Sequence, residues 1–187
     1  WTDLADPRFA KLVSSARADK SGSAYMQLAN TLLAYPDKGW DIYTSIMKNM
    51  VISASSGSVP KFVNDGEQAV GITLEDNAFR YVQGGGPVKI VYPDDGAVAA
   101  PDGLALLKGA PNVEAGRIFI DWCLSKPTQE FLVDTMFRRS VRIDCKDPPG
   151  LPALKTIKTI PYNFGWAAGN KDAFSKKFAD IAMELGL

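Results

Sequence analysis

The sequence predicts an α/β fold built on a largely parallel sheet, and two features carry that prediction. First, strand-type and helix-type stretches alternate over residues 9–92 in the order β-α-α-β-α-β-α-β. Second, residues 68–74 (QAVGITL) are nearly all apolar, as in a strand that is buried on both faces. Because parallel strands need crossover connections, we expect the intervening helices to cover the sheet.

Spacing and turn residues place the elements of the first half. Residues 9–16 and 51–54 are expected to be strands, and residues 37–50 a helix. The helix expected within residues 18–36 ends at Pro36 and has apolar residues at helical spacing: Tyr25, Leu28, Ala29, Leu32 and Leu33. The next elements are a helix over 57–67 with Ser58 as N-cap and Pro60 in its first turn, the strand 68–74, a glycine-closed helix over 75–86, and a strand over 88–92.

The second half is read in the same way. We expect a strand over 103–109, a helix over 127–137 that begins near Pro127, and a proline-rich extended arm over 145–165. A helix over 112–125 has Asn112 as its cap, and its spacing predicts a buried face of Ala115, Ile118, Phe119 and Trp122. A terminal helix over 170–185 has one apolar stripe, formed by Phe174, Phe178, Ile181 and Leu185.

Composition excludes several classes of protein. The chain has 187 residues, enough for one domain or two small ones, and 46% of them are apolar. Lys plus Arg equals Asp plus Glu at 21 each, so no strong field attracts nucleic acid or a membrane surface. No apolar run approaches the roughly 20 residues that a membrane span needs. The chain begins at Trp1 without an initiator Met, which suggests a mature or excised piece.

The chemistry of the side chains argues against an enzyme. The chain has no His to activate a nucleophile, and it contains no G-x-S-x-G or P-loop motif. The two cysteines, Cys123 and Cys145, are too far apart for a C-x-x-C pair, and without His a zinc site is improbable. They form either one disulfide, which export would favour, or two small apolar core residues. We therefore expect no catalytic residue, no cofactor and no metal site.

Two turns rich in hydroxyl groups stand where a strand gives way to a helix. The first holds Ser21, Gly22 and Ser23, and the second holds Ser56, Gly57 and Ser58. A helix N-terminus has unpaired N–H groups and a partial positive charge, so such turns can hold an anion. The alternative is plain helix capping, for which serine is a preferred residue.

A third turn is acidic. Glu75 and Asp76 follow the strand 68–74 and can bind hydroxyl groups or an ammonium group of a ligand. The alternative is the ordinary placement of acidic residues in the first turn of a helix. Residues 137–144 (FRRSVRID) contain three arginines, which fit either a solvated helix end or a contact with a partner.

Read in order, these segments resemble a known family. The stretches WTDLADPRF, KSGSAYMQLANTLL, VNDGEQAVGITLEDNAFRYVQGGGPVKIVYPDDG, PDGLALLKGAPNVEAGRIFIDWCLSKPTQEFL and RRSVRIDCKDPPGLPALKTI are similar to those of extracellular solute-binding proteins. The resemblance is to receptors of bacterial ABC importers for ferric ion, hexose phosphates, phosphoglycerate or aminoethylphosphonate, which have the type 2 periplasmic-binding-protein fold. It extends over essentially the whole chain.

The resemblance implies a fold and a domain organisation. Members of this group are markedly longer and have two α/β lobes that close on a ligand, so this chain would be a C-terminal part: one near-complete α/β lobe plus part of the other. Residues 1–97 would form the second lobe, and residues 98–140 would cross over and contribute a strand and helices to the first lobe. Residues 141–187, the proline-rich arm and terminal helix, would return to the second lobe.

The resemblance also implies ligand-binding residues. In ferric-binding members the first turn binds the phosphate that accompanies iron, which corresponds here to Ser21, Gly22 and Ser23, and the next turn, near Ser56, adds an anion contact. Two adjacent tyrosines hold the iron in those members, but this chain has Glu75 and Asp76 at that place, and Tyr81 lies a turn later. This departure favours the organophosphate-type members.

The expected function is therefore capture of a small phosphorylated or phosphonate solute, by a monomer, for delivery to the membrane permease of an ABC importer. The expected location is the periplasm, or outside the cell as a secreted or lipid-anchored protein. A ferric-ion receptor and a ligand sensor for a two-component kinase are the alternatives. We expect no nucleic-acid partner.

Overall fold

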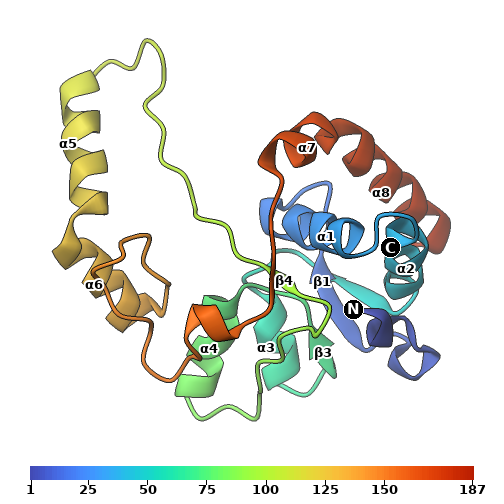
Figure 1. Ribbon diagram of the computed structural model, residues 1–187. Coiled ribbons are helices and arrows are strands. Elements are labelled where there is room, and N and C mark those ends of the chain that lie inside the picture. Colours follow the sequence, from blue (N-terminus) through green and yellow to red (C-terminus); the bar gives the residue numbers. More distant parts are fainter. The chain divides into compact units, whose positions relative to one another are not determined.

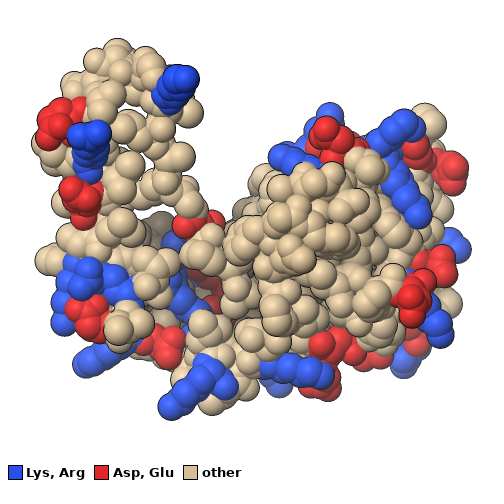
Figure 2. Space-filling model, turned by 45° about the horizontal axis from the view of Figure 1, so that its top comes forward, with Lys and Arg blue, Asp and Glu red and all other residues tan.

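The computed structural model describes residues 1–187, which fall into two compact units (Figure 1). Unit 1 comprises Trp1–Ala99 together with Lys158–Leu187, and unit 2 comprises Ala100–Ile157. The terminal segment therefore belongs with the first half of the chain. Basic and acidic side chains lie interspersed over the surface in Figure 2, in keeping with the equal numbers of each sign. None of the helices combines the length and the apolar character needed to cross a bilayer.

Unit 1 contains a parallel three-stranded sheet in the order β2-β1-β3. The strands are β1 (Val13–Ala16), β2 (Met50–Ser53) and β3 (Val70–Gly71). Val13 pairs with Met50 on one side and with Val70 on the other. All four residues of the central strand β1 are buried. The predicted α/β class with a parallel sheet is confirmed.

Helices α1 (Gly22–Ala34), α2 (Gly39–Met47), α7 (Phe164–Gly169) and α8 (Lys171–Leu185) build the main core with β1. Leu28, Tyr43 and Phe178 are fully buried there, on three different helices. Arg17 lies over the Phe178 ring, 5.6 Å from its centroid. The terminal helix, predicted from its apolar stripe, is thus part of the same core as α1 and α2.

Two glycines allow helices to approach their neighbours closely. A Cβ on Gly39 would lie 2.8 Å from Leu32 Cα, so α2 can begin directly against α1 only because this residue has no side chain. A Cβ on Gly71 would lie 2.7 Å from Val59 Cγ1, where α3 (Val59–Asn64) packs on β3. Neither close approach could be predicted from residues adjacent in the chain.

The predicted strand over 9–16 is shorter than expected, because short 3₁₀ turns precede it. These turns are η1 (Thr2–Ala5) and η2 (Pro7–Phe9). The side-chain nitrogen of Asn49, Nδ2, donates to the carbonyl oxygens of Leu4 and Asp6 at 2.8 and 2.9 Å. It thereby holds this segment near the start of β2.

The strand predicted over 68–74 is also reduced, to the edge strand β3. Its two residues are only half-buried, so the expectation of burial on both faces was wrong. An edge position explains the difference, because no further strand covers that side. Helix α4 (Glu75–Gln83) follows it and ends at Gly84, as expected.

Unit 1 is completed by β4 (Ala97–Val98) and β5 (Thr159–Ile160), which pair in parallel. Asn30 of α1 donates its side-chain amide to the Gly96 carbonyl at 3.2 Å, so this ribbon is tied to α1. Residues 88–92 and 103–109 were predicted as strands, and both predictions were wrong. A strand persists only where a neighbouring strand pairs with it, and neither stretch has one.

Unit 2 contains α5 (Val113–Leu124), α6 (Lys126–Met136) and the 3₁₀ turn η3 (Leu154–Thr156). Asn112 caps α5 as predicted, its Oδ1 accepting from the Ala115 amide at 3.1 Å. The predicted burial of the apolar face of α5 was wrong: Ile118, Phe119 and Trp122 are 62%, 55% and 58% exposed. Helical spacing identifies an apolar face, but unit 2 supplies too few residues to cover it.

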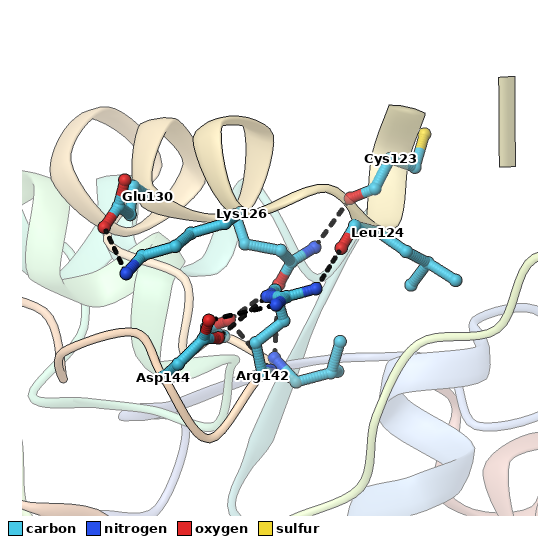
Figure 3. A network of polar contacts seen from close by, with 9 residues as sticks. Cys123, Leu124, Lys126, Glu130, Arg142 and Asp144 are labelled. Carbon is cyan, nitrogen blue, oxygen red and sulfur yellow. Dashed lines mark hydrogen bonds and ion pairs between the residues drawn. The ribbon is translucent and has the colours of Figure 1, made fainter. Parts of the chain in front are cut away.

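The arginine-rich stretch 137–144 forms contacts within unit 2. Arg142 pairs with Asp144 at 2.8 Å and donates to the Leu124 carbonyl at 3.2 Å (Figure 3). The Arg142 guanidinium holds the pKa of Asp144 below its usual range. Arg139 pairs with Asp147 at 2.8 Å. These contacts favour the structural interpretation of the stretch.

Cys123 and Cys145 are both free and half-buried. The Cys123 thiol points away from the Arg142 network in Figure 3, while its carbonyl accepts from Gln129 Nε2 at 2.9 Å. Neither of the two roles considered for the cysteines, a disulfide or burial in a core, is seen.

Candidate functional site

The strand order locates a crevice at the carboxyl edge of the sheet. The chain passes from β1 to β2 on one side and then returns past β1 to β3 on the other. In open parallel sheets, ligands bind outside the carboxyl ends of the strands where the strand order reverses in this way. Three segments lie after these strand ends: the turn 17–21 before α1, the loop 54–58 before α3, and the first turn of α4.

Ser21 is the N-cap of α1, and its hydrogen bonds show which first-turn amides remain. Its Oγ accepts from the Ala24 amide at 3.3 Å, and its carbonyl accepts from the Tyr25 amide at 2.9 Å. The Ser21 amide itself donates to the Arg17 carbonyl at 2.9 Å. Of the four N–H groups at the helix start, those of Ser21, Gly22, Ser23 and Ala24, only the amides of Gly22 and Ser23 are then left for a ligand. Capping and anion binding are therefore compatible at this turn.

A surface cavity of about 280 Å³ adjoins Ser21 at the ends of β1 and β2. Lys20, exposed at the turn, brings a positive charge to it, whereas the Ser53 hydroxyl in its wall donates to the Ser55 carbonyl at 2.9 Å. The cavity is lined by Ala16, Arg17, Lys20, Ser21, Ile52, Ser53 and Ala54. Gly22 is exposed, and a Cβ on it would meet nothing within 4 Å. We call this space the Ser21 cavity.

Arg17 belongs to the wall of the Ser21 cavity, but its guanidinium is held in place elsewhere. Its Nε and Nη2 donate to the two carboxylate oxygens of Asp19 at 2.9 and 3.2 Å. Its Nη1 donates to the Leu187 carbonyl at 3.2 Å. Arg17 therefore joins the turn before α1 to the end of α8, and Lys20 is the cation better placed to meet a ligand.

The position of α1 itself is fixed by a buried tyrosine. The Tyr25 hydroxyl donates to the Ala167 carbonyl of α7. Burial raises the pKa of Tyr25, so this hydroxyl stays protonated as a donor. The first turn of α1 is thus presented from a packed helix rather than from a loop.

The loop 54–58 is organised by its own hydroxyl groups. Ser55 Oγ lies 2.9 Å from Ser58 Oγ and accepts from the Ser58 amide at 3.2 Å. Ser58 is the N-cap residue of α3, as predicted, but its side chain makes no capping bond. The Ser56 carbonyl accepts from Thr73 Oγ1 at 2.8 Å, which joins this loop to the end of β3.

The acidic pair lies in the first turn of α4, as predicted. The Tyr92 hydroxyl donates to Glu75 Oε1. Asp76 is buried, and its Oδ2 lies 3.9 Å from Arg80 Nη2. Both carboxylates therefore have neighbours of their own in unit 1.

A second surface cavity, of about 270 Å³, is lined by Gly57, Asn77, Arg80 and Tyr81. We call it the Arg80 cavity. Of the predicted site residues, the structure places Ser21 at one cavity and Gly57 at the other, and it joins the Ser56 loop to Thr73. Sequence reasoning did not single out four residues that line the cavities, namely Lys20, Ser53, Asn77 and Arg80. The spacing of Asn77, Arg80 and Tyr81 along one helix face is the one signal that could have grouped them.

No group of three or more Cys, Asp or Glu side chains is placed to hold a metal ion. The donors around the two cavities are hydroxyl groups, amides and cations, and the first turn of α4 adds two carboxylates, which accept hydrogen bonds. This set suits an oxyanion that also has an organic part.

Comparisons with known proteins agree with this geometry. The profile of the bacterial extracellular solute-binding protein family matches residues 1–165. A Haemophilus influenzae protein of uncharacterised function is 31% identical over 132 residues, which are 70% of this chain and 38% of that protein. A periplasmic protein of Salmonella typhimurium, named for 2-aminoethylphosphonate binding, is 30% identical over 152 residues, covering 77% of this chain and 45% of that protein.

A solved structure matches the whole chain. It is the periplasmic binding protein AfuA from Actinobacillus pleuropneumoniae with exogenous fructose-6-phosphate bound, at 26% identity and a TM-score of 0.89. The match covers 100% of this chain and 60% of that one. The chain thus spans less than half the length of the two curated relatives and about three fifths of the solved one.

Proposed function

We propose, because this chain belongs to the bacterial extracellular solute-binding protein family, that it captures a small solute by the solute's phosphate or phosphonate group. Members of this family bind solutes and are not enzymes, and their place is the periplasm or the cell exterior. The identity of the bound group is the part proposed here.

The observation that carries the proposal is the Ser21 cavity. It lies at the N-terminus of a 13-residue helix, beside the exposed cation of Lys20. A helix N-terminus and a nearby cation both favour an anion, and the Gly22 and Ser23 amides supply directed donors. The sugar phosphate in the AfuA structure and the phosphonate in the name of the Salmonella protein belong to this same class of solute.

In this proposal the other predicted residues bind the organic part of the solute. The loop that contains Ser56, Gly57 and Ser58 contributes backbone and hydroxyl donors. Glu75 and Asp76 accept hydrogen bonds from hydroxyl or amino groups of the organic part. The Thr73–Ser56 hydrogen bond supports this arrangement, because it keeps the loop beside the first turn of α4.

The proposal includes a two-lobed receptor. In this proposal residues 1–97 and the last part of the returning segment, 158–187, form its second lobe, and residues 98–140 contribute to the first. Residues 141–157, expected to return to the second lobe, group with unit 2 instead. The exposed apolar face of α5 supports this, since a face of that kind is normally covered in a folded protein. Ligand that contacts both lobes would favour the closed state, which is then presented to a permease of the membrane.

A ferric-ion receptor is the competing function within the same group. The place of its tyrosine pair is taken by Glu75 and Asp76, and Tyr81 lines the Arg80 cavity instead. Delivery to a sensor kinase in place of a permease would leave the solute site unchanged, so it does not alter the binding prediction.

Calorimetric titration of the 187-residue chain tests the proposal. We expect binding of at least one of a hexose phosphate, phosphoglycerate or aminoethylphosphonate, and none of the corresponding sugar without phosphate. Lys20→Gln should weaken binding about two- to fivefold, because it removes one exposed charge from the cavity rim.

The matched control is Lys48→Gln, an exposed lysine at the C-cap of α2, which precedes β2 and so lies at the opposite edge of the sheet. It should leave the affinity unchanged. Tight ferric binding without heat from any phosphorylated or phosphonate solute would overturn the proposal.

A further inference from the structure

The Arg80 cavity has its own donors and shares no lining residue with the Ser21 cavity. Asn77, Arg80 and Tyr81 are spaced i, i+3 and i+4 on α4, so they lie on one face of that helix. Gly57 closes the cavity from the loop before α3. The Thr73–Ser56 hydrogen bond holds this loop, so the opposing wall is fixed.

Arg80 supplies the positive charge of this cavity. Its side chain is 43% exposed, and its Nη2 lies 3.9 Å from Asp76 Oδ2, too far for a hydrogen bond. A guanidinium has five N–H donors in a fixed fork that matches a carboxylate with two parallel bonds. The Asn77 amide and the Tyr81 hydroxyl add neutral donors on the same face. These groups together suit a planar acidic group.

The two cavities are close enough to serve one small molecule. Ala54 lines the Ser21 cavity and Gly57 lines the Arg80 cavity, and the loop between them spans three residues. A chain of that length covers at most about 11 Å even when fully extended. The edges of the two cavities at Ala54 and Gly57 are therefore near enough for us to consider one solute with an acidic group at each end.

We propose that the Arg80 cavity binds a carboxylate of the solute whose phosphate is held at the Ser21 cavity. This proposal rests on the proposed function. It narrows the class of solute to phosphorylated carboxylic acids, in preference to phosphates of sugars that have no carboxyl group. Arg80 is the specificity-determining residue, and Asn77 and Tyr81 orient the carboxylate beside it.

A matched pair of probes tests this. 3-Phosphoglycerate and glycerol 3-phosphate differ only in having a carboxylate or a hydroxymethyl group. We expect the 187-residue chain to bind 3-phosphoglycerate at least about tenfold more tightly, as for a charge-assisted contact. Arg80→Gln should abolish this preference, because it removes the charge that pairs with the carboxylate. Arg80→Lys should keep part of the preference, since it keeps the charge but loses the fork.

Lys61→Gln is the control variant. Lys61 is an exposed residue of α3 that pairs with Asp65, and it lines neither cavity. It should keep the full preference. Equal affinity of the native chain for both probes, or a preference that survives Arg80→Gln, would overturn the inference while leaving phosphate capture intact. Failure of glycerol 3-phosphate and 3-phosphoglycerate alike to bind would overturn the inference, and phosphate capture would then be decided by the titrations with hexose phosphate and aminoethylphosphonate.

Discussion

Ser21 has a structural task and a proposed binding task, and its geometry separates them. The Oγ accepts from the Ala24 amide, whereas the donors proposed for the ligand are the neighbouring amides of Gly22 and Ser23. A side chain that can cap the helix but repels an anion should therefore keep the fold and lose the ligand. Aspartate is such a residue, because it is a good N-cap and carries a negative charge.

We predict that Ser21→Asp keeps the free energy of unfolding close to that of the native chain and weakens phosphate-ester binding at least about tenfold. Ser21→Ala should lower the free energy of unfolding by about 1 kcal/mol, because the cap is lost. It should weaken phosphate-ester binding less than Ser21→Asp does, because it adds no negative charge. Urea denaturation and calorimetry measure the two effects. If Ser21→Asp binds as well as the native chain, the anion does not sit at this turn.

At the residue scale, the sequence predicted the caps better than it predicted the site. Ser21 and Asn112 cap α1 and α5 as expected, because capping depends on residues that are adjacent in the chain. Ser55, rather than Ser58, supplies the hydroxyl oxygen that organises the second turn. Lys20 and Arg80 acquire a role only through the cavities that they line, which depend on distant parts of the chain.

At the scale of elements, the contact between α1 and α2 is unusually close. Gly39 begins α2 where any Cβ would meet the backbone of Leu32. We predict that Gly39→Ala destabilises unit 1 by about 1–3 kcal/mol, the range for overpacking of a core. Urea denaturation followed by circular dichroism measures it.

Gly169→Ala is the matched control, since a Cβ at this helical position would meet nothing within 4 Å. It should not lower the free energy of unfolding. Equal effects of the two substitutions would show that the loss of glycine matters through the backbone and not through the α1–α2 contact.

The helices were predictable and several strands were not, for a physical reason. A helix satisfies its backbone hydrogen bonds locally, so the spacing in 18–36, 112–125 and 170–185 sufficed to find α1, α5 and α8. A strand depends on a neighbour, and residues 88–92 and 103–109 have the composition of strands without a partner. The exposed face of α5 follows the same rule, because amphipathicity does not supply the surface that covers it.

At the scale of the whole molecule, the family and the fold class could be anticipated from ordered motifs along the chain. The parallel order β2-β1-β3 then places three chain segments at one edge of the sheet, where the family's solutes would be expected to bind. The solute could not be deduced from sequence, because it depends on how the Ser21 and Arg80 cavities are arranged. The proposed lobe boundaries depend on residues of longer relatives that this chain does not span.

The central claim is that a phosphate group is held by the first turn of α1. Amide chemical shifts of the ¹⁵N-labelled chain, titrated with fructose 6-phosphate and in parallel with fructose, test it most directly. We predict that the largest shifts with fructose 6-phosphate fall on Gly22 and Ser23, and that fructose moves neither. Unmoved Gly22 and Ser23 amides in a chain that binds the phosphate ester elsewhere would contradict the claim.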